Sequence, residues 1–392
     1  MTDTQAGIIA LVKSALTGNG TIPTYELNWD EITDISRKHQ IFPMVYYGAF
    51  SSHTEIPEKN LAVLESYVYK GLSVDQNQIF ALKSIEKELT KNKIDYMPLK
   101  GSWLKFVYPK TDMRTMGDID ILIREEQYEK IIPIMEKLGY TFKAETSHDL
   151  EWNGKLAHIE LHKSLIPPQN TDFYGYFGSG WEKAIQSPEN LFCYTLSDEE
   201  QLIYLFTHFV KHYRSAGIGI RHITDIWVFR STHPNIDEKQ VLKALKIMGL
   251  DAFYRNVSAT LANWFENKPA TEITDYITDY IFESGAYGVN KNRLIFNEAI
   301  KNTDGAFGQT KIRYILKTVF PPLSAMRLAY PVLKRCPFLL PFVWVVRWFK
   351  GLFFKSYRIK QSFENLSCLN SADIDEQKKA LQFVGLKSEF KE

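Results

Sequence analysis

The sequence predicts an α+β protein in which a small mixed β-sheet is flanked by helical regions before and after it. Apolar residues recur at helical spacing through residues 1–92 and again from residue 191. Between these regions, short segments alternate apolar and polar residues with the period of two that is typical of strands. We therefore expect an N-terminal helical region at 1–92, a sheet-containing core at 93–190 and a C-terminal helical region at 191–392.

Each element of the core has its own signal. Segment 93–101 is short, apolar and ends in glycine, which favours a strand. Segment 118–123, DIDILI, places isoleucines on one face and two carboxylates on the other, and segment 155–166 alternates in the same way. The predicted order is strand (93–101), helical turns (102–109), strand (118–123), helix (124–140), strand (140–145), strand (155–166) and a loop rich in Gly, Pro and Asn (167–180).

Length and charge narrow the class of protein. The chain has 392 residues, 45% of them hydrophobic, which is enough for a sizeable core and more than one domain. Lys and Arg number 47 and Asp and Glu 46, so the formal net charge is +1. This balance does not favour bulk electrostatic binding of nucleic acid, and it leaves open a local basic patch near the C-terminus.

The cysteines and the N-terminus indicate a reducing compartment. Cys193, Cys336 and Cys368 are widely separated and form neither a C-x-x-C spacing nor a disulfide framework, so we expect no disulfide partner. The N-terminal segment has an early Asp3 and no cluster of positive charge, which argues against a secretory signal. We expect a cytoplasmic protein, with association at the membrane periphery as an alternative.

The segment 312–358 mixes apolar, aromatic and basic residues. Its apolar run, 338–349, is too short for a transmembrane helix, which needs about 20 residues. Such a segment either packs on a protein core with its lysines extended to water or lies on an anionic membrane surface. We favour core packing and keep membrane-surface contact as the alternative. The tail at 371–392 is expected to be a loose helix or disordered.

Three acidic residues are the candidate catalytic and metal-binding groups. Asp118 and Asp120 project from one strand face about 6–7 Å apart, and two such carboxylates repel unless a cation lies between them. Oxygen ligands suit Mg²⁺, with Mn²⁺ as an alternative, and such an ion also binds substrate phosphates. Glu160, on the polar face of a later strand, would complete a site for two ions that polarise an α-phosphate and help to deprotonate an acceptor hydroxyl.

The residues before these acids are candidates for nucleotide binding. Gly101 and Ser102 end a strand and begin a helix, where backbone N–H groups and the serine hydroxyl can meet phosphate oxygens. Lys100 and Arg114 are the nearest cations and could neutralise triphosphate charge. Taken singly, a D-x-D is commonly a solvated strand edge, a Gly-Ser pair a turn and an arginine a surface charge. Their occurrence in this order favours the catalytic interpretation.

Several histidines have spacings that bear on metal binding. His158 and His162 flank Glu160, but a strand spaces them about 13 Å apart, too far to share one zinc ion. They are expected to support the acids or to be satisfied core residues. His208 and His212 have the i,i+4 spacing of a metal pair. We favour a helix face packed against the sheet for them, with His208 lining the site as an alternative.

Two further pairs have a structural and a functional interpretation. Arg221 and Asp225 are four residues apart on a predicted helix, where we expect an ion pair, with contact to nucleotide or acceptor as the alternative. Tyr174 and Tyr176 lie in the predicted loop at 167–180. They are expected to anchor that loop, and stacking on a base is the alternative.

The run PLKGSWLKFVYPKTDMRTMGDIDILI resembles the bacterial uncharacterised nucleotidyltransferase family of the polymerase-β-like nucleotidyltransferase superfamily. That superfamily has a hydrophobic-Gly-Gly/Ser motif, then D-x-D/E, then a third acid on a later strand, which here correspond to Gly101-Ser102, Asp118 with Asp120, and Glu160. The resemblance covers residues 30–350 and is specific within 97–162. It implies a nucleotidyltransferase core in the sheet region.

The resemblance implies transfer of an NMP from an NTP, ATP being one candidate, with release of pyrophosphate. The acceptor is left open among small molecules, RNA and proteins, because the fold alone does not define it. We expect the active-site cleft between the sheet and the helices after residue 190, with the sheet between helical layers. The alternative is a non-catalytic nucleotide-binding or scaffold protein that retains the fold.

Overall fold

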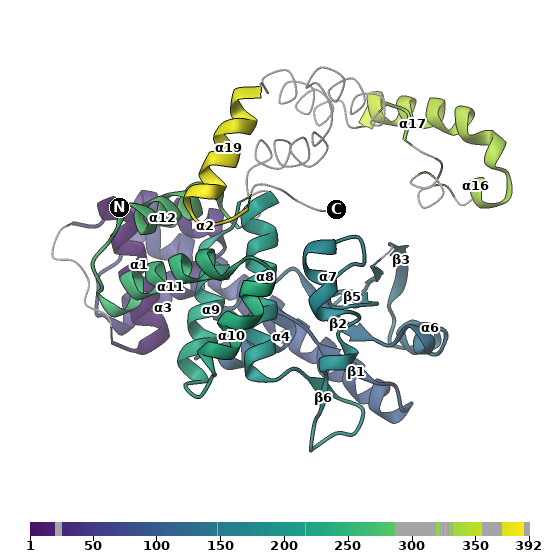
Figure 1. Cartoon of the computed structure of the whole chain (residues 1–392), viewed down its shortest axis with the longest axis horizontal. Helices are drawn as coiled ribbons and strands as arrows, with labels where there is room; N and C mark the ends of the chain where they lie inside the picture. Colours follow the sequence, from purple (N-terminus) through teal and green to yellow (C-terminus); the bar gives the residue numbers. More distant parts are fainter. Residues whose placement is uncertain are drawn as a thin grey trace.

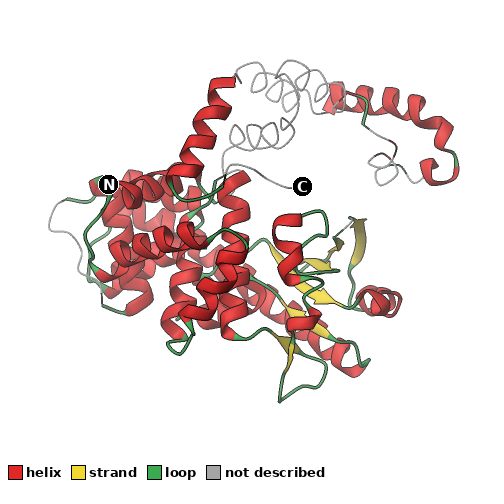
Figure 2. Cartoon of the chain, viewed as in Figure 1, coloured by secondary structure: helices red, strands yellow, loops and turns green. Residues whose placement is uncertain are grey.

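The helices gather at one end of the molecule and the main sheet lies at the other (Figures 1 and 2). The computed structural model describes residues 1–19, 26–146, 148–215, 217–286, 332–354 and 371–387, with a few positions between 319 and 330. The sequence-based fold class, a small mixed sheet with helical regions before and after it, is confirmed.

Four helices precede the sheet in the described part of the chain. Thr2 begins the first of them with a capping box, in which its hydroxyl accepts from the backbone N–H of Gln5 and the Gln5 side chain accepts from the backbone N–H of Thr2. Gly48 lets the first and third helices cross closely, because a Cβ there would lie 2.0 Å from the Leu11 carbonyl oxygen. The four helices are α1 (Asp3–Thr17), α2 (Trp29–His39), α3 (Phe42–Ser51) and α4 (Glu58–Lys91).

The main sheet has five strands in the order β1-β2-β5-β4-β3. Its central pair, β2 and β5, is parallel, and the other neighbours are antiparallel. The sequence analysis missed β4, although Leu150 and Trp152 alternate there with polar residues and are buried. The strands are β1 (Tyr96–Pro98), β2 (Asp118–Ile123), β3 (Thr141–Glu145), β4 (Asp149–Asn153) and β5 (His158–His162).

Short helices connect and follow the strands. The expected helical turns after the first strand are present, and the expected helix after β2 ends before Gly139, whose φ is +82°. The predicted loop at 167–180 is wrong in part, because a helix spans Thr171–Phe177 and buries Phe173 and Phe177. These helices are α5 (Gly101–Leu104), α6 (Tyr128–Lys137) and α7 (Thr171–Phe177), and a small hairpin pairs β6 (Ile185–Gln186) with β7 (Tyr194–Thr195).

The two faces of the sheet have different environments. Ile119, Ile121 and Ile123 of β2 are buried in one apolar cluster with side chains of α4 and α6. Leu122 faces the other way and joins the larger cluster that the helices build. Asp118 and Asp120 alternate with the isoleucines, so they share this second face, which is oriented toward the helical end of the molecule.

The helices after the sheet pack with those before it. Buried side chains of α1 and α3 belong to the same cluster as those of the later helices. The sheet lies between helices on both faces, as expected: α4 and α6 cover one face, and the larger helical cluster lies against the other. The helices before the sheet do not form a layer of their own, because α1 packs on α11 while α4 covers the sheet. The later helices are α8 (Asp198–Ser215), α9 (Ile220–Thr232), α10 (Glu238–Ile247), α11 (Asp251–Glu266) and α12 (Glu272–Ser284).

Three helices follow residue 331 in the described part of the chain. α16 (Val332–Arg335) and α17 (Leu340–Phe354) lie apart from the main body (Figure 1), and Leu333 and Val343 are buried in a small cluster of their own. The expected packing of this segment on the main core is therefore wrong for its described residues. Much of 312–331 lies outside the described residues. No helix in the described ranges is both long enough and apolar enough to cross a membrane.

The C-terminal tail docks on the helical body. α19 (Ser371–Phe383) is followed by Val384 and Leu386, which are buried in the main cluster together with Leu381. The Asn256 side chain of α11 donates to the Val384 carbonyl oxygen at 2.9 Å. The expected helix is therefore present at 371–383, but the end is docked on the helical body rather than loose or disordered. Cys193 and Cys336 are free thiols, and Cys368 lies outside the described residues.

Candidate active site

The parallel pairing of β2 and β5 brings the acids together. Its register places Asp118 opposite His158 and Asp120 opposite Glu160. Ligand atoms of Asp120, Glu160 and His162 all lie within 4.8 Å of one another. We call Asp118, Asp120, Glu160 and His162 the acidic cluster. The convergence predicted from two separate strands is present for Asp120 and Glu160, and their roles in catalysis stay a prediction.

Asp120 is the most constrained acid of the cluster. It is 6% exposed, and its Oδ1 accepts from Lys100 Nζ at 2.9 Å and lies 2.6 Å from His162 Nε2. Burial works to raise the pKa of Asp120, but Lys100 and His162 outweigh it and hold this pKa below its ordinary value. Asp120 is therefore ionised at neutral pH. Burial also opposes the charge on Lys100, and the Asp120 carboxylate more than compensates, so the Lys100 pKa is raised.

Glu160 has the opposite electrostatic behaviour. Partial burial raises its pKa from 4.5 to about 8, and the negative charges of Asp118 and Asp120 add to this shift. His158 and His162 flank it, with Nε2 to carboxylate distances of 3.7 Å and 3.8 Å. The group of Asp120, Glu160 and His162 could hold a metal ion, and His158 is not a member of this group. A cation beside the three carboxylates would relieve the repulsion that adds to the raised Glu160 pKa.

The loop before α5 positions Lys100. Lys100 has φ 48° and ψ −124°, a backbone conformation that costs a non-glycine residue free energy and commonly occurs at functional sites. Two hydrogen bonds to β2 hold the loop there: Leu99 N–H donates to the Asp120 carbonyl oxygen at 3.0 Å, and Asp120 N–H donates to Ser102 Oγ at 2.8 Å. Ser102 is fully buried, so its hydroxyl positions the strand that carries Asp120.

Gly101 lies against Arg114. A Cβ at Gly101 would be 3.1 Å from Arg114 Nη1 and 3.2 Å from the Met116 sulfur, so a side chain there would press on the guanidinium group. The close approach that the glycine permits in this structure is to Arg114. Phosphate approach, for which we singled out Gly101, stays a prediction.

Arg114 is buried and bonded to α9. Its Nε donates to Asp225 Oδ1 at 2.7 Å and its Nη1 to the Thr115 carbonyl oxygen at 2.7 Å. Tyr108 donates its hydroxyl to the same Asp225 oxygen at 2.6 Å. Arg114 therefore ties the loop before β2 to the helical body, which is a positioning role. The sequence analysis assigned Asp225 to Arg221, whose Nη1 donates to the Thr115 carbonyl oxygen at 2.8 Å.

Two residues that contribute to the site, His148 and Lys211, were not singled out in the sequence analysis. His162 is linked to His148, with 3.1 Å between His162 Nδ1 and His148 Nε2, so a histidine chain extends from Asp120. Lys211 of α8 is close enough for the charges of Asp120 and Glu160 to act on it. Burial and the positive charge of Lys100 lower the pKa of Lys211, and the negative charges of Asp120 and Glu160 partly oppose this shift. The sequence shows the helical spacing of the segment around Lys211. It does not show which elements this helix packs against, so the position of Lys211 near the acids could not be predicted.

The two tyrosines of α7 make different contacts. Tyr176 donates its hydroxyl to Glu200 at 2.8 Å, and the Lys183 amine lies 3.9 Å from the centre of its ring. Tyr174 packs against the main apolar cluster. The anchoring role that we favoured for these residues is confirmed for Tyr176, and base stacking has no support from its contacts.

The sequence matches the profile of a family described as "Uncharacterised nucleotidyltransferase" over residues 25–266, well over half of the chain. The chain belongs to this nucleotidyltransferase family. No curated protein matches the sequence. One solved structure that matches is the solution structure of the antibiotic-resistance factor ANT(2'')-Ia, with a TM-score of 0.33 and 12% identity, covering 50% of this chain and 100% of that chain.

Family membership gives the reaction class and the general kind of substrate. It supports nucleotidyl transfer as the general activity and implies an NTP as one substrate. Nucleotidyltransferase folds usually use divalent metals, and the group of Asp120, Glu160 and His162 could hold one. The acidic cluster is the part of the described chain whose chemistry fits such a reaction.

Proposed function

We propose that this nucleotidyltransferase transfers an NMP from an NTP to an acceptor hydroxyl and releases pyrophosphate, with divalent cations at Asp118, Asp120 and Glu160. The observation that carries the proposal is the pairing of Asp120 with Glu160 across two parallel strands, where burial and then the charges of Asp118 and Asp120 raise the Glu160 pKa to about 8. Carboxylates that repel one another in this way are suited to a site that a cation completes.

The donor set fits a hard divalent cation. The cluster offers carboxylate oxygens, which Mg²⁺ prefers, and Mn²⁺ also accepts the His162 nitrogen beside them. When bound, two such ions would neutralise charge at the α-phosphate and favour loss of the proton from the acceptor hydroxyl. Lys100 and His162 keep Asp120 ionised, so this carboxylate needs no deprotonation before an ion binds.

The proposed roles of the other residues follow from their positions. Glu160, once a cation has displaced the proton that its raised pKa retains, would hold that cation and assist deprotonation of the acceptor hydroxyl. Lys211, a cation of α8 on which the charges of Asp120 and Glu160 act, would bind triphosphate oxygens. We retain Lys100, Gly101 and Ser102 as the proposed binding position of the β- and γ-phosphates, with Arg114 behind Gly101 as their support.

Transfer of label from α-³²P-NTPs tests the proposal. The wild-type protein would be incubated with each NTP, ATP first, with Mg²⁺ or Mn²⁺, and with separate pools of small molecules, RNA and proteins. We expect label in one pool, pyrophosphate release, and a loss of at least about 100-fold in Asp120→Asn. Asp34→Asn is the matched control, because Asp34 is an exposed helix residue whose side chain is 76% accessible.

The alternative is a non-catalytic scaffold that retains the fold. It predicts no labelled product in any pool and no magnesium-dependent NTP binding by calorimetry. In that case Asp120→Asn would leave NTP binding unchanged. Magnesium-dependent binding without transfer would instead contradict the enzymatic proposal while retaining nucleotide binding.

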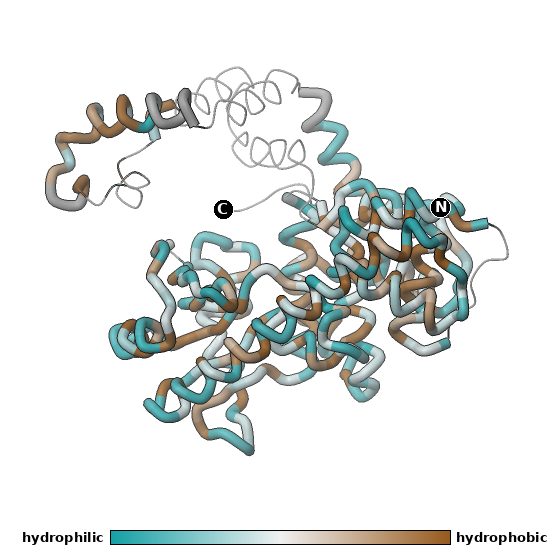
Figure 3. The backbone as a smooth tube through the Cα atoms, turned by 180° about the vertical axis from the view of Figure 1, so that it is seen from behind, coloured by the Kyte–Doolittle hydropathy of each residue, from teal (hydrophilic) through white to brown (hydrophobic). Residues whose placement is uncertain are grey.

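One structural observation supports membrane-surface contact through 312–358. Phe338, Phe342 and Val346 follow one another at helical spacing and are 75%, 70% and 47% exposed. Figure 3 shows this part of the chain as largely hydrophobic. We propose that this stripe contacts an anionic lipid surface. Phe338→Ser with Phe342→Ser should then reduce co-sedimentation with phosphatidylserine vesicles, and equal sedimentation of both proteins would contradict it.

A further inference from the structure

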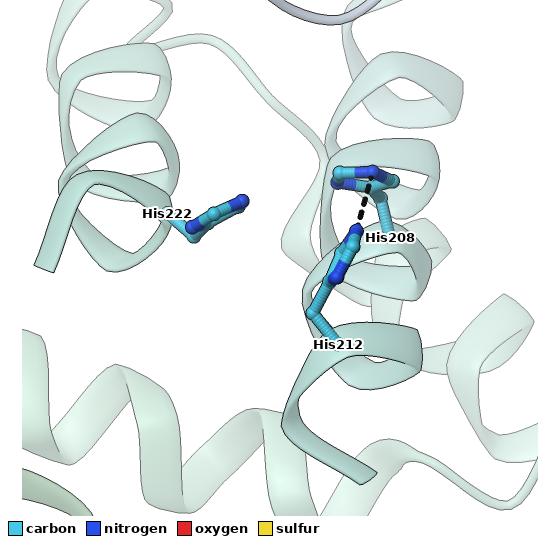
Figure 4. A group of neighbouring side chains, drawn as sticks. All are labelled: His208, His212 and His222. Atoms are coloured by element: carbon cyan, nitrogen blue, oxygen red, sulfur yellow. Dashed lines mark hydrogen bonds between the residues drawn. The ribbon is translucent and has the colours of Figure 1, made fainter. Parts of the chain in front are cut away.

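Three histidines come together on the helices beside the acidic cluster. His208 and His212 are one turn apart on α8, and His222 extends from α9 toward them (Figure 4). Ligand atoms of the three residues all lie within 4.8 Å of one another, and the Nε2 atoms of His208 and His212 are 3.1 Å apart. We call His208, His212 and His222 the histidine cluster.

The cluster presents nitrogen lone pairs on side chains that are half-buried at His208 and His212 and buried at His222. His222 is 8% exposed, and its Nδ1 is buried with no hydrogen-bond partner in the described part of the chain. Burial lowers the pKa of both His208 and His222 well below the ordinary value, so both are neutral at pH 7. Neutral imidazole is the form that binds metal ions.

The distances are close to those of a metal-bound set. With metal–nitrogen bonds of about 2.1 Å, tetrahedral ligand nitrogens lie about 3.4 Å apart. The 3.1 Å pair of His208 and His212 is already near this value, and a shift of the His222 ring toward it would complete the set. An uncharged hydrogen-bonding cluster would instead need a donor for each buried lone pair. In the described part of the chain His222 Nδ1 has no such donor, and the Gly219 carbonyl that acts on this ring can only accept.

The surrounding charges select against hard cations. Lys100 and Lys211 act on His208, and Arg221 and Arg114 act on His222, so the cluster lies in a positive environment. Mg²⁺ and Ca²⁺ depend on anionic oxygen ligands, and the cluster has no carboxylate among its members. Zinc-class ions form stronger bonds to imidazole and can bind neutral ligands against such charge.

We propose that His208, His212 and His222 form a binding site for one transition-metal ion of the zinc class, separate from the acidic cluster. Such an ion would link α8 to α9, the helix that also carries Asp225, the partner of Arg114. Three protein ligands leave a fourth coordination position for water or a substrate group. The site is additional to the carboxylate-bound cations of the proposed function and does not depend on them.

Metal binding to the chelator-stripped wild-type protein tests the proposal. Zn²⁺ would be titrated by calorimetry in excess Mg²⁺, which competes for the acidic cluster, and Co²⁺ would report its coordination by visible absorption. We expect one Zn²⁺ per chain and intense Co²⁺ bands, which indicate tetrahedral nitrogen coordination. Absence of Zn²⁺ binding by the folded wild-type protein, or only weak octahedral Co²⁺ bands, would overturn the proposal.

Variants assign the ion to one cluster. His222→Gln should weaken Zn²⁺ binding by at least about 100-fold, since loss of even an outer partner of a metal ligand costs about 10–100-fold. Glu160→Gln should leave Zn²⁺ affinity unchanged, and so should His53→Asn, which alters an exposed histidine. Loss of Zn²⁺ binding in Glu160→Gln would place the ion at the acidic cluster and overturn the proposal. Circular dichroism of each variant separates loss of a ligand from loss of the fold.

Discussion

The acidic cluster and the histidine cluster lie near each other and have opposite chemistry. The first offers oxygens on a sheet, and burial together with the neighbouring negative charges raises the Glu160 pKa. The second offers nitrogens on two helices, and its burial keeps His208 and His222 neutral. Both can hold a cation, but for different reasons: one needs charge neutralisation and the other needs lone-pair donation. The difference shows how one chain can separate hard from softer metal ions.

Loss of the ion pair that links the two clusters should have the largest effect on stability. Arg114 and Asp225 form a buried ion pair that joins the loop before β2 to α9, which carries His222. Arg114→Met should lower the free energy of unfolding by about 3–5 kcal/mol, because Asp225 would lose its buried counter-charge. Urea unfolding measures this, with Arg37→Met as a control, since the Arg37–Asp34 pair is exposed. Equal stability of the two variants would show that the clusters are supported independently.

Removal of one acid should distinguish the clusters most clearly in function. Glu160→Gln should reduce Mg²⁺ affinity and nucleotidyl transfer by about 100-fold or more. Mg²⁺ titration followed by calorimetry, together with the transfer assay, measures both. A variant that keeps its Mg²⁺ affinity would remove Glu160 from the metal site and leave Asp118 and Asp120 as its candidates.

Lys211 is expected to contribute a smaller, substrate-specific effect. Lys211→Met should raise the KM for the NTP about 10-fold, the size of one hydrogen bond to a charged group, with kcat less affected. Lys155→Met is the control, because Lys155 is an exposed residue of a turn. A fall in kcat at constant KM would instead indicate a contact made only in the transition state.

The smallest predicted effect is a pH dependence. Glu160 binds a proton more tightly in the folded chain, so its contribution to stability falls as pH rises from 4.5 to about 8 without metal. Mg²⁺ displaces this proton, so the Mg²⁺-dependent rise in Tm should grow with pH and level off above about 8. Glu86, whose pKa burial raises to about 7, titrates in the same window. Comparing each pH with and without Mg²⁺ isolates Glu160, and a flat difference would contradict its place in the site.

Local sequence patterns predicted the residues of the acidic cluster better than the buried Arg114–Asp225 ion pair that supports it. DIDILI gave the bounds of β2 as observed, because strand periodicity depends only on neighbouring residues. Asp225 was assigned to Arg221, four residues away, while its ion-pair partner Arg114 is 111 residues away in sequence. His208 and His212 were recognised as a pair, but the third histidine comes from another helix. Such partners depend on tertiary packing, which helical spacing does not report.

Residue composition also led to two wrong predictions of secondary structure. The Gly- and Asn-rich segment after β5 suggested a loop, but Phe173 and Phe177 supply an apolar face that stabilises α7. The polar segment before β5 was passed over, although Leu150 and Trp152 pack into the sheet cluster and make β4. In both cases, two buried apolar residues outweigh the average character of the segment.

The docked tail has a consequence for handling this protein. Leu381, Val384 and Leu386 cover apolar side chains of the helical body, and α11 holds them through Asn256. Truncation ahead of residue 371 would uncover that apolar surface and favour self-association. A shortened version made to remove the last residues should therefore keep them through 387, or replace the uncovered apolar side chains with polar ones.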